Sequence, residues 1–143
     1  WKVGGNTYSN IYSKTPSVVY QNEIVNPVTT NTTDNATEYT AKIGLMYVSD
    51  YGFAAEPSAW TLTMGNYNNT TATSTNWMYM GLYEWTISRG TDYSGRAFLV
   101  EVYGYVSCLG VGNVIAVRPV FSLTFSVNYA SGSGSATDPI SIN

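Results

Sequence analysis

The chain has 143 residues, with 6 Lys and Arg against 9 Asp and Glu, and its formal net charge is −3. This length fits one compact domain, residues 1–143. The weak negative charge predicts no basic surface that could bind nucleic acid or an anionic membrane. The absence of histidine and the single cysteine, Cys108, exclude Ser-His-Asp and Cys-His catalysis, an intrachain disulfide and a multi-thiolate metal cluster.

The polar part of the composition favours a protein displayed outside the cell. It is rich in Thr, Ser and Asn and includes 13 tyrosines, a set shared by secreted β-rich surfaces and by paratopes. No apolar run approaches the ~20 residues needed to span a bilayer. Because Trp1 is an implausible natural start, we expect an export signal or anchor upstream, and contact with a membrane only through that missing segment.

Residues 1–38 are expected to form N-terminal strands and a loop. A Gly-Gly turn interrupts the strand-like residues 1–8, the β-branched run 17–20 predicts a second edge strand, and the Thr-rich stretch 26–35 indicates an exposed loop. Residues 39–143 are expected to form the core of the domain.

This core is predicted to begin with a buried strand over 39–46. Ser49 and Asp50 then indicate a helix start, followed by a short helix over 51–55. A second short helix or turn is predicted after Pro57, and residues 65–71 are predicted to be loop.

From Asn76 onward the pattern is that of a β-protein. Two short helices, mixed or antiparallel sheets and long loops together predict an α+β fold. The expected strands are 77–79, 82–87, 97–102, 103–106 and 114–127, with a closing strand over 138–142 after the Gly/Ser-rich stretch 131–135.

Several single residues have structural interpretations. Cys108 is expected to be buried, and Arg118, flanked by apolar residues, is expected to pair with Glu84 because a buried guanidinium needs an acidic partner. Helix capping is the expected role of Asp50. The tryptophans Trp60, Trp77 and Trp85 are expected in the core. Because no sequence context separates the pKa values of any two carboxyl groups, we expect no acid–base pair and no catalytic residue. With no histidine and one cysteine, we expect no metal and no cofactor.

The segment 90–115 is the expected functional region. It mixes glycine, tyrosine, small polar and apolar residues without one clean period, and two framework-like stretches bracket it: 83–89, which reads YEWTISR, and 116–121, which reads AVRPVF. Such a mixture suits a ligand-facing surface better than a catalytic motif.

Three blocks resemble the C-type-lectin-like fold, in the branch shared by sulfatase-modifying-factor-like domains and the variable proteins of diversity-generating retroelements. Residues 45–54 are similar to the block written R-L-P-T-x-x-E-W-x-x-A. Residues 83–86 are similar to the W-E-W-T block, and residues 116–120 are similar to the G-F-R-P block. Residues 43–52, with Gly and Ser at 131–134 and Asp138-Pro139, also resemble C-terminal domains of gut-bacterial pilin-like surface proteins. The chain lacks the Glu-Pro-Asn and Trp-Asn-Asp motifs of calcium-dependent lectins and the cysteine pair of formylglycine-generating members.

The resemblance implies that positions between the second and third blocks vary. Adenine-directed mutation of AAC or AAT codons reaches every residue of 90–115 except Glu101. Half of the interval is expected to be scaffold, and the individual tyrosines are equally compatible with ordinary sheet surface. The predicted ligand-contacting positions are the turn and outward residues Tyr93, Arg96, Leu99, Tyr103, Tyr105, Ser107, Leu109, Asn113 and Ile115.

The sequence thus predicts a non-enzymatic, adhesin-like or receptor-like binding domain, located extracellularly on a cell surface or pilus. Its expected partner is a protein or glycan ligand on another cell, a host or a phage. The first alternative is a structural subunit of a pilus or surface layer, in which the same segment contacts pilus subunits. A weaker alternative is an inactive or unrecognised enzyme of the sulfatase-modifying type.

Overall fold

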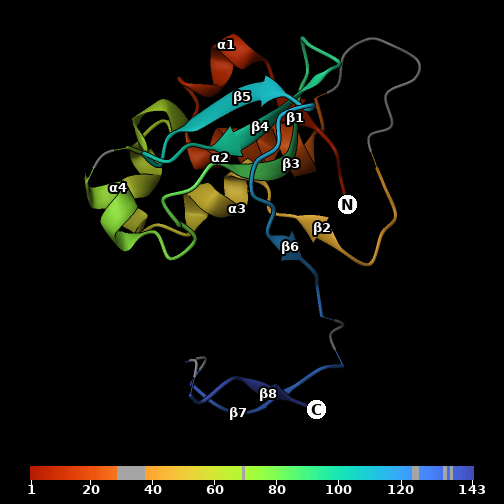
Figure 1. Cartoon of the computed structure of the whole chain (residues 1–143), viewed down its shortest axis with the longest axis vertical. Coiled ribbons are helices and arrows are strands. Elements are labelled where there is room, and N and C mark those ends of the chain that lie inside the picture. The colour runs from red at the N-terminus through yellow and green to blue at the C-terminus, as the bar shows by residue number, and fades with distance from the viewer. Residues whose placement is uncertain (29–37, 69, 124–125, 134, 136) are drawn as a thin grey trace.

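The computed structural model describes residues 1–28, 38–68, 70–123, 126–133, 135 and 137–143 (Figure 1). The protein is a mixed α+β fold with short helices, a four-stranded sheet and two smaller two-stranded sheets. The core lies between the four-stranded sheet and the helices that pack on one of its faces.

The four-stranded sheet has the order β1-β3-β4-β5. β1 runs parallel to β3, while β3, β4 and β5 are successive antiparallel strands. Phe98 pairs with Cys108 and Val100 with Val106, and these four side chains face the core. The strands are β1 (Gly5–Asn6), β3 (Glu84–Gly90), β4 (Arg96–Val100) and β5 (Val106–Gly110).

The helices are short and come mainly from the first half of the chain. The α-helices are α1 (Tyr8–Ile11), α2 (Pro16–Tyr20), α3 (Val48–Phe53) and α4 (Thr70–Thr75). A π-helical turn, η1 (Gln21–Val25), extends α2, and 3-10 turns form η2 (Pro57–Thr61) and η3 (Met64–Asn66). The carboxylate of Asp50 accepts the Tyr47 N–H at 2.9 Å and so caps the start of α3, in the role expected for it.

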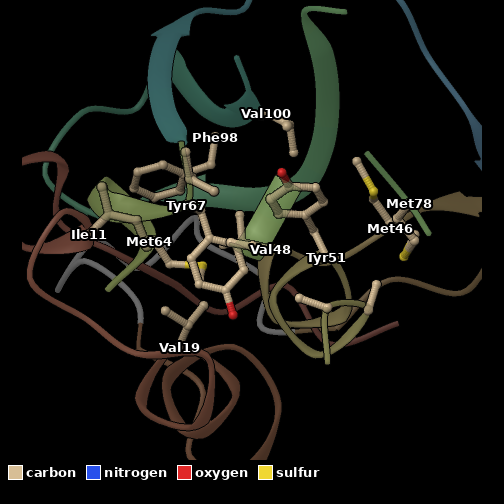
Figure 2. Packing of buried hydrophobic residues seen from close by; sticks show 14 of the residues in the cluster. Ile11, Val19, Met46, Val48, Tyr51, Met64, Tyr67, Met78, Phe98 and Val100 are labelled. Carbon is tan, nitrogen blue, oxygen red and sulfur yellow. The ribbon is translucent and has the colours of Figure 1, made fainter. Parts of the chain in front are cut away.

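The central core residues come from α3, the sheet and the 3-10 turns (Figure 2). Tyr51 and Val48 from α3 belong to one cluster with Phe98 from β4, and Met64 and Tyr67 lie beside them. All five side chains are fully buried. Burial of each large apolar side chain stabilises the fold by about 1.5–3 kcal/mol.

Strands from the C-terminal part of the chain take part in both smaller sheets. β2 (Gly44–Leu45) pairs with β6 (Pro119–Val120) in antiparallel register, next to the main sheet. β7 (Tyr129–Ser131) pairs with β8 (Ser141–Ile142), and Figure 1 shows this hairpin apart from the rest of the chain.

Several sequence predictions are confirmed. The helices near 51–55 and after Pro57 exist, and strands cover most of 82–87 and 97–102. Cys108 is buried and is a free thiol. Arg118 pairs with Glu84: Nε and Nη2 donate to the two carboxylate oxygens, each at 2.7 Å.

Other predictions are wrong. Residues 17–20 lie in α2 rather than in a strand, because Pro16 starts the helix at a position where its missing N–H costs nothing. Part of the predicted loop 65–71 is helical, in η3 and α4. Of the predicted strand 39–46 only β2 forms, and of 114–127 only β6 is a strand among the described residues. The four α-helices of the described chain exceed the two that were predicted.

Two tryptophans are not where the sequence predicted them. Trp77 is 76% exposed, and Trp60 is also on the surface, with its indole N–H donating to the Ala55 carbonyl at 2.9 Å. Trp85 is half-buried. The predicted loop 26–35 can be compared with the structure only as far as Val28, because residues 29–35 lie outside the described part.

Candidate functional site

The segment 90–115 contains the β4–β5 hairpin and its flanking turns. In the turn between these strands, the Glu101 N–H donates to Tyr105 O at 2.9 Å and the Gly104 N–H donates to Glu101 O at 2.8 Å. Gly104 has φ = +95°, and an added Cβ there would meet the Tyr67 carbonyl oxygen at 2.9 Å. Glycine is therefore required at this position for both conformation and space.

Two tyrosine hydroxyls hold this turn against the scaffold. Tyr51 from α3 donates to Gly104 O at 2.7 Å, and Tyr79 donates to Val102 O at 2.6 Å. Burial raises the pKa of Tyr51 above its ordinary value, so its hydroxyl remains a donor at physiological pH. The turn is thus fixed through its backbone while the side chain of Tyr103 remains exposed.

An arginine between aromatic rings lies at the opposite end of the hairpin. The Arg96 guanidinium carbon is 4.6 Å from the ring centre of Tyr93 and 5.4 Å from that of Tyr8. Tyr8 in α1 and Tyr12 directly after this helix stack edge to face, with centroids 5.9 Å apart and an interplanar angle of 78°. Cation–π contacts and aromatic pairs of this kind orient the side chains that make them.

The β3–β4 turn ties α1 to the hairpin. The Tyr8 N–H donates to both Asp92 carboxylate oxygens, at 3.0 and 3.2 Å. Asp92 thereby satisfies a backbone donor at the start of α1 that has no partner within the helix. α1 is consequently held beside the segment 90–115, and its tyrosines lie on the same surface.

Hydroxyl and carboxyl groups continue this surface toward the β4–β5 turn. Burial and the neighbouring Tyr8 raise the pKa of Tyr12, although its contact with the Ser107 hydroxyl opposes the shift. The Glu101 carboxylate raises the pKa of Tyr83, with which it forms a hydrogen bond. The pKa of Tyr105 is raised mainly by burial and, to a smaller extent, by the charge of Glu101. These phenols are neutral hydrogen-bonding groups at physiological pH.

We call this surface the tyrosine patch. Its members share an exposed or half-buried aromatic or guanidinium group. They lie in or directly after α1, just before β3, in the β3–β4 turn and in the β4–β5 hairpin: Tyr8, Tyr12, Tyr83, Tyr93, Arg96, Tyr103 and Tyr105.

Four of the predicted contact residues, Tyr93, Arg96, Tyr103 and Tyr105, belong to the tyrosine patch. The others do not. Leu109 and Ile115 are half-buried, and Asn113 is exposed in the turn after β5, where its amide donates to Gly110 O at 2.8 Å.

The two remaining predicted contact residues need correction. Leu99 is fully buried and Ser107 nearly so, which leaves a ligand almost no side-chain surface to touch. Strand alternation places their side chains on the sheet face opposite Phe98, Val100 and Cys108. Leu99, however, lies between its partners Trp85 on β3 and Ser107 on β5. A position in the middle of a sheet face is covered by its cross-strand neighbours.

Three members of the tyrosine patch were missed by sequence reasoning. Tyr8 and Tyr12 come from the N-terminal segment, and Tyr83 precedes the variable interval. The high tyrosine content was the available signal, but it does not say which tyrosines lie together. The Tyr8–Asp92 contact joins residues 84 positions apart, so only the fold reveals it.

A buried carboxyl group, Glu23, lies away from this surface. It accepts the Ser49 N–H at 3.1 Å and the Ser88 hydroxyl, and it links η1 to α3 and β3. Burial raises the pKa of Glu23 from 4.5 to about 7, partly offset by these hydrogen bonds. Because the group is fully buried, we assign it a structural role rather than contact with a ligand.

The described residues contain neither a metal-binding cluster nor a membrane-spanning helix. No group of three or more His, Cys, Asp or Glu side chains lies close enough to hold a metal ion. No helix there has both the length and the apolar character to cross a membrane. Comparisons with protein-family models, curated proteins and solved structures found no match to the chain.

Proposed function

We propose that this protein is a non-enzymatic ligand-binding module displayed outside the cell, and that the tyrosine patch is its binding surface. The observation that carries the proposal is the placement of Arg96 between Tyr8 and Tyr93, on the same surface as further tyrosines near the β4–β5 turn. Its ligand is a protein or a glycan on another cell, a host or a phage.

The residue types of the tyrosine patch suit binding. Tyrosine offers a large amphipathic surface with few rotatable bonds, and together with arginine it is enriched among the residues that dominate binding energies. The contacts of Arg96 with two rings restrict its side chain before any ligand arrives. Less conformational entropy is then lost on binding.

The way in which the scaffold holds the hairpin is compatible with sequence variation in 90–115. Tyr51 and Tyr79 bond to backbone carbonyls of the turn, at Gly104 and Val102. Replacement of the neighbouring side chains Tyr103 and Tyr105 would leave both hydrogen bonds in place. This supports the resemblance to retroelement variable proteins, and with it our proposal of a C-type-lectin-like fold whose diversified surface lies on a constant frame.

A second candidate, a structural subunit of a pilus or surface layer, is favoured by the C-terminal part of the chain. Large apolar side chains are exposed there, among them Val114, Phe121, Tyr129 and Ile140. Exposed apolar surface of this extent marks contacts with other proteins. In this alternative the C-terminal region contacts neighbouring subunits.

Sequencing of the coding region across a natural population tests the proposal. We expect substitutions to concentrate at adenines within codons 90–115, while codons 83–89 and 116–121 stay constant. An even spread of substitutions would contradict a diversified binding surface and favour the structural subunit.

Two variants complete the test once a ligand has been identified. Tyr103 and Tyr129 are both 66% exposed, but only Tyr103 lies in the tyrosine patch. We expect Tyr103→Ala to weaken binding about tenfold or more, as truncation of a hot-spot residue does, and Tyr129→Ala to leave it unchanged. A larger loss with Tyr129→Ala would contradict the proposal.

A further inference from the structure

A groove between α3 and β6 shares no residue with the tyrosine patch. Its volume is about 370 Å³. Most of its walls are apolar, and Met46 and Met78 lie side by side at the edge of the core in Figure 2. The lining residues are Met46, Asp50, Phe53, Ala54, Trp77, Met78 and Val120.

Trp77 is the unusual member of this groove. With 76% of its surface exposed, it contributes little to the core, although its backbone N–H donates to Ala54 O at 3.4 Å and so keeps the residue next to the end of α3. A large aromatic side chain exposed to water beside an apolar groove is a feature of binding sites.

The second aromatic wall is Phe53. Its ring meets Trp60 edge to face, at a centroid distance of 5.2 Å and an interplanar angle of 89°, and it also packs edge to face with Tyr20 at 6.4 Å. These neighbours fix the Phe53 ring. Because Phe53 and Trp60 are perpendicular, they form a corner rather than the flat aromatic platform that would stack on a sugar ring.

The groove has one charged lining residue, Asp50. One carboxylate oxygen accepts the Tyr47 N–H, and burial raises the pKa of Asp50 despite that bond. A cation in the groove would stabilise the charged carboxylate. The nearby Arg118, whose Nη2 lies 3.9 Å from Met46 Sδ, is held by both oxygens of Glu84 and by Met78 O.

We propose that this groove binds an alkylammonium group, with the cation near Asp50 and the aromatic faces of Trp77 and Phe53 and with the alkyl part against the two methionines. Aromatic faces attract ammonium ions, most strongly when they are indoles, and thioether side chains adapt to alkyl groups of different shape. A sugar would need several convergent hydrogen-bonding side chains, whereas an alkylammonium needs one carboxylate and apolar walls. The lining residues match the second requirement.

Two sources can supply this chemistry: a small quaternary ammonium compound, or a lysine side chain on a partner protein. The test is an NMR titration of the intact protein, following the Trp77 indole N–H, whose signal is assigned by its loss in Trp77→Phe. The probes are choline, its neutral isostere 3,3-dimethylbutan-1-ol, and Nα-acetyl-lysine amide.

We expect choline or the lysine amide to shift the Trp77 signal saturably, and the neutral isostere to bind about tenfold more weakly because it lacks the charge. Tighter binding of choline would identify the small-molecule source, and tighter binding of the lysine amide the protein source. Equal binding of choline and its isostere, or no saturable shift with either cation, would overturn the proposal.

Two variants and a control locate the site. Trp77→Ala and Asp50→Asn should each weaken cation binding about tenfold. Because Trp77→Ala lacks the indole signal, the backbone amides of Ala54 and Met78, which also line the groove, report binding in both variants. Asn keeps an oxygen that can accept the Tyr47 N–H, so α3 stays capped. Tyr129→Ala, which removes an exposed aromatic side chain that neither lines the groove nor contacts Phe53, should leave the affinity unchanged. Unchanged binding in Asp50→Asn, with the fold intact by NMR, would overturn the role of the carboxylate and with it the proposal. None of these results depends on the function of the tyrosine patch.

Discussion

The β4–β5 hairpin and the C-terminal region 114–142 have similar strand-like sequences but opposite environments. Phe98, Val100 and Val106 of the hairpin are buried in the core. Val117, Phe121 and Ile142 are exposed, and the C-terminal strands are only two or three residues long. Both regions contain apolar residues over strand-like lengths, so the sequence pattern alone does not explain the difference.

What separates the two regions is a second layer. The hairpin has α3 against its core face, and hydroxyl groups from Tyr51 and Tyr79 fix its turn. β7 and β8 form only a two-stranded ladder with each other. A two-stranded hairpin is at best marginally stable alone. Strand-like sequence becomes stable structure only where another element covers one of its faces, and the following predictions test this at single residues.

The largest effect is expected from a matched pair of phenylalanines. Phe98 is fully buried, whereas Phe121 is 67% exposed. Phe98→Ala should lower the free energy of unfolding by about 3–5 kcal/mol, because it leaves a cavity in the core. Phe121→Ala should change it by less than about 0.5 kcal/mol, as surface substitutions do. Urea unfolding of both variants measures the difference, and a comparable loss with Phe121→Ala would show that the C-terminal region is covered in solution.

A dependence of stability on pH is expected from Glu23, which links η1, α3 and β3. Its pKa is about 7 in the folded protein, against an ordinary value of 4.5, so the folded state binds this proton more tightly. The contribution of protonated Glu23 to the free energy of unfolding is therefore complete below pH 4.5 and is lost as the pH rises through 7. The loss amounts to about 3 kcal/mol at 1.36 kcal/mol per pKa unit.

The measurement is the free energy of unfolding at a series of pH values from 4.5 to 8. Glu23→Gln keeps the size of the side chain and removes the titrating group, so the decline attributed to Glu23 should disappear in this variant. If the wild-type protein and Glu23→Gln lose stability equally over this range, another group is responsible.

A smaller effect is expected where the two regions meet. Arg118 lies next to β6 and pairs with the nearly buried carboxylate of Glu84 at the start of β3. Arg118→Met should lower the free energy of unfolding by about 2 kcal/mol, because it leaves that carboxylate without its partner; the partial exposure of Arg118 reduces the loss below that of a fully buried pair. The double variant Arg118→Met/Glu84→Gln should recover part of the stability. No recovery would show that packing rather than charge dominates.

The parts of the fold that were predictable from sequence are those in which residue type alone determines the outcome. The Arg118–Glu84 pair followed from the need of a buried guanidinium for a carboxylate. Of the hairpin strands, β4 matches most of the predicted strand 97–102, which followed from its apolar run, whereas β5 shares only Val106 with the predicted strand 103–106. α4 was missed because its residues are mostly threonines, which have low helix propensity. In the structure the Thr75 hydroxyl donates to the Thr71 carbonyl one turn earlier, at 2.7 Å.

The candidate site was predictable in its location but not in its full composition. The interval 90–115 contains Tyr93, Arg96, Tyr103 and Tyr105, which lie in the tyrosine patch. Alternation also marked Leu99 as outward-facing, but it could not show that Trp85 and Ser107 flank it. The contribution of α1 depends on long-range contacts such as Tyr8 with Arg96. Periodicity describes one strand at a time, so contacts between distant elements are beyond it.

The smallest predicted effect concerns the hydroxyl groups that hold the β4–β5 turn. Tyr51→Phe keeps the aromatic ring in the core and removes the bond to Gly104 O. It should cost about 1–2 kcal/mol, because a buried carbonyl loses its partner. Tyr79→Phe removes the corresponding bond to Val102 O from a half-buried position, where water can replace it, so a smaller loss is expected. Hydrogen exchange is the informative measurement, because the Gly104 and Glu101 amides should exchange faster in Tyr51→Phe while those within β4 change little. Uniformly faster exchange throughout the sheet would mean that Tyr51 stabilises the whole fold rather than holding the turn in place for the side chains it displays.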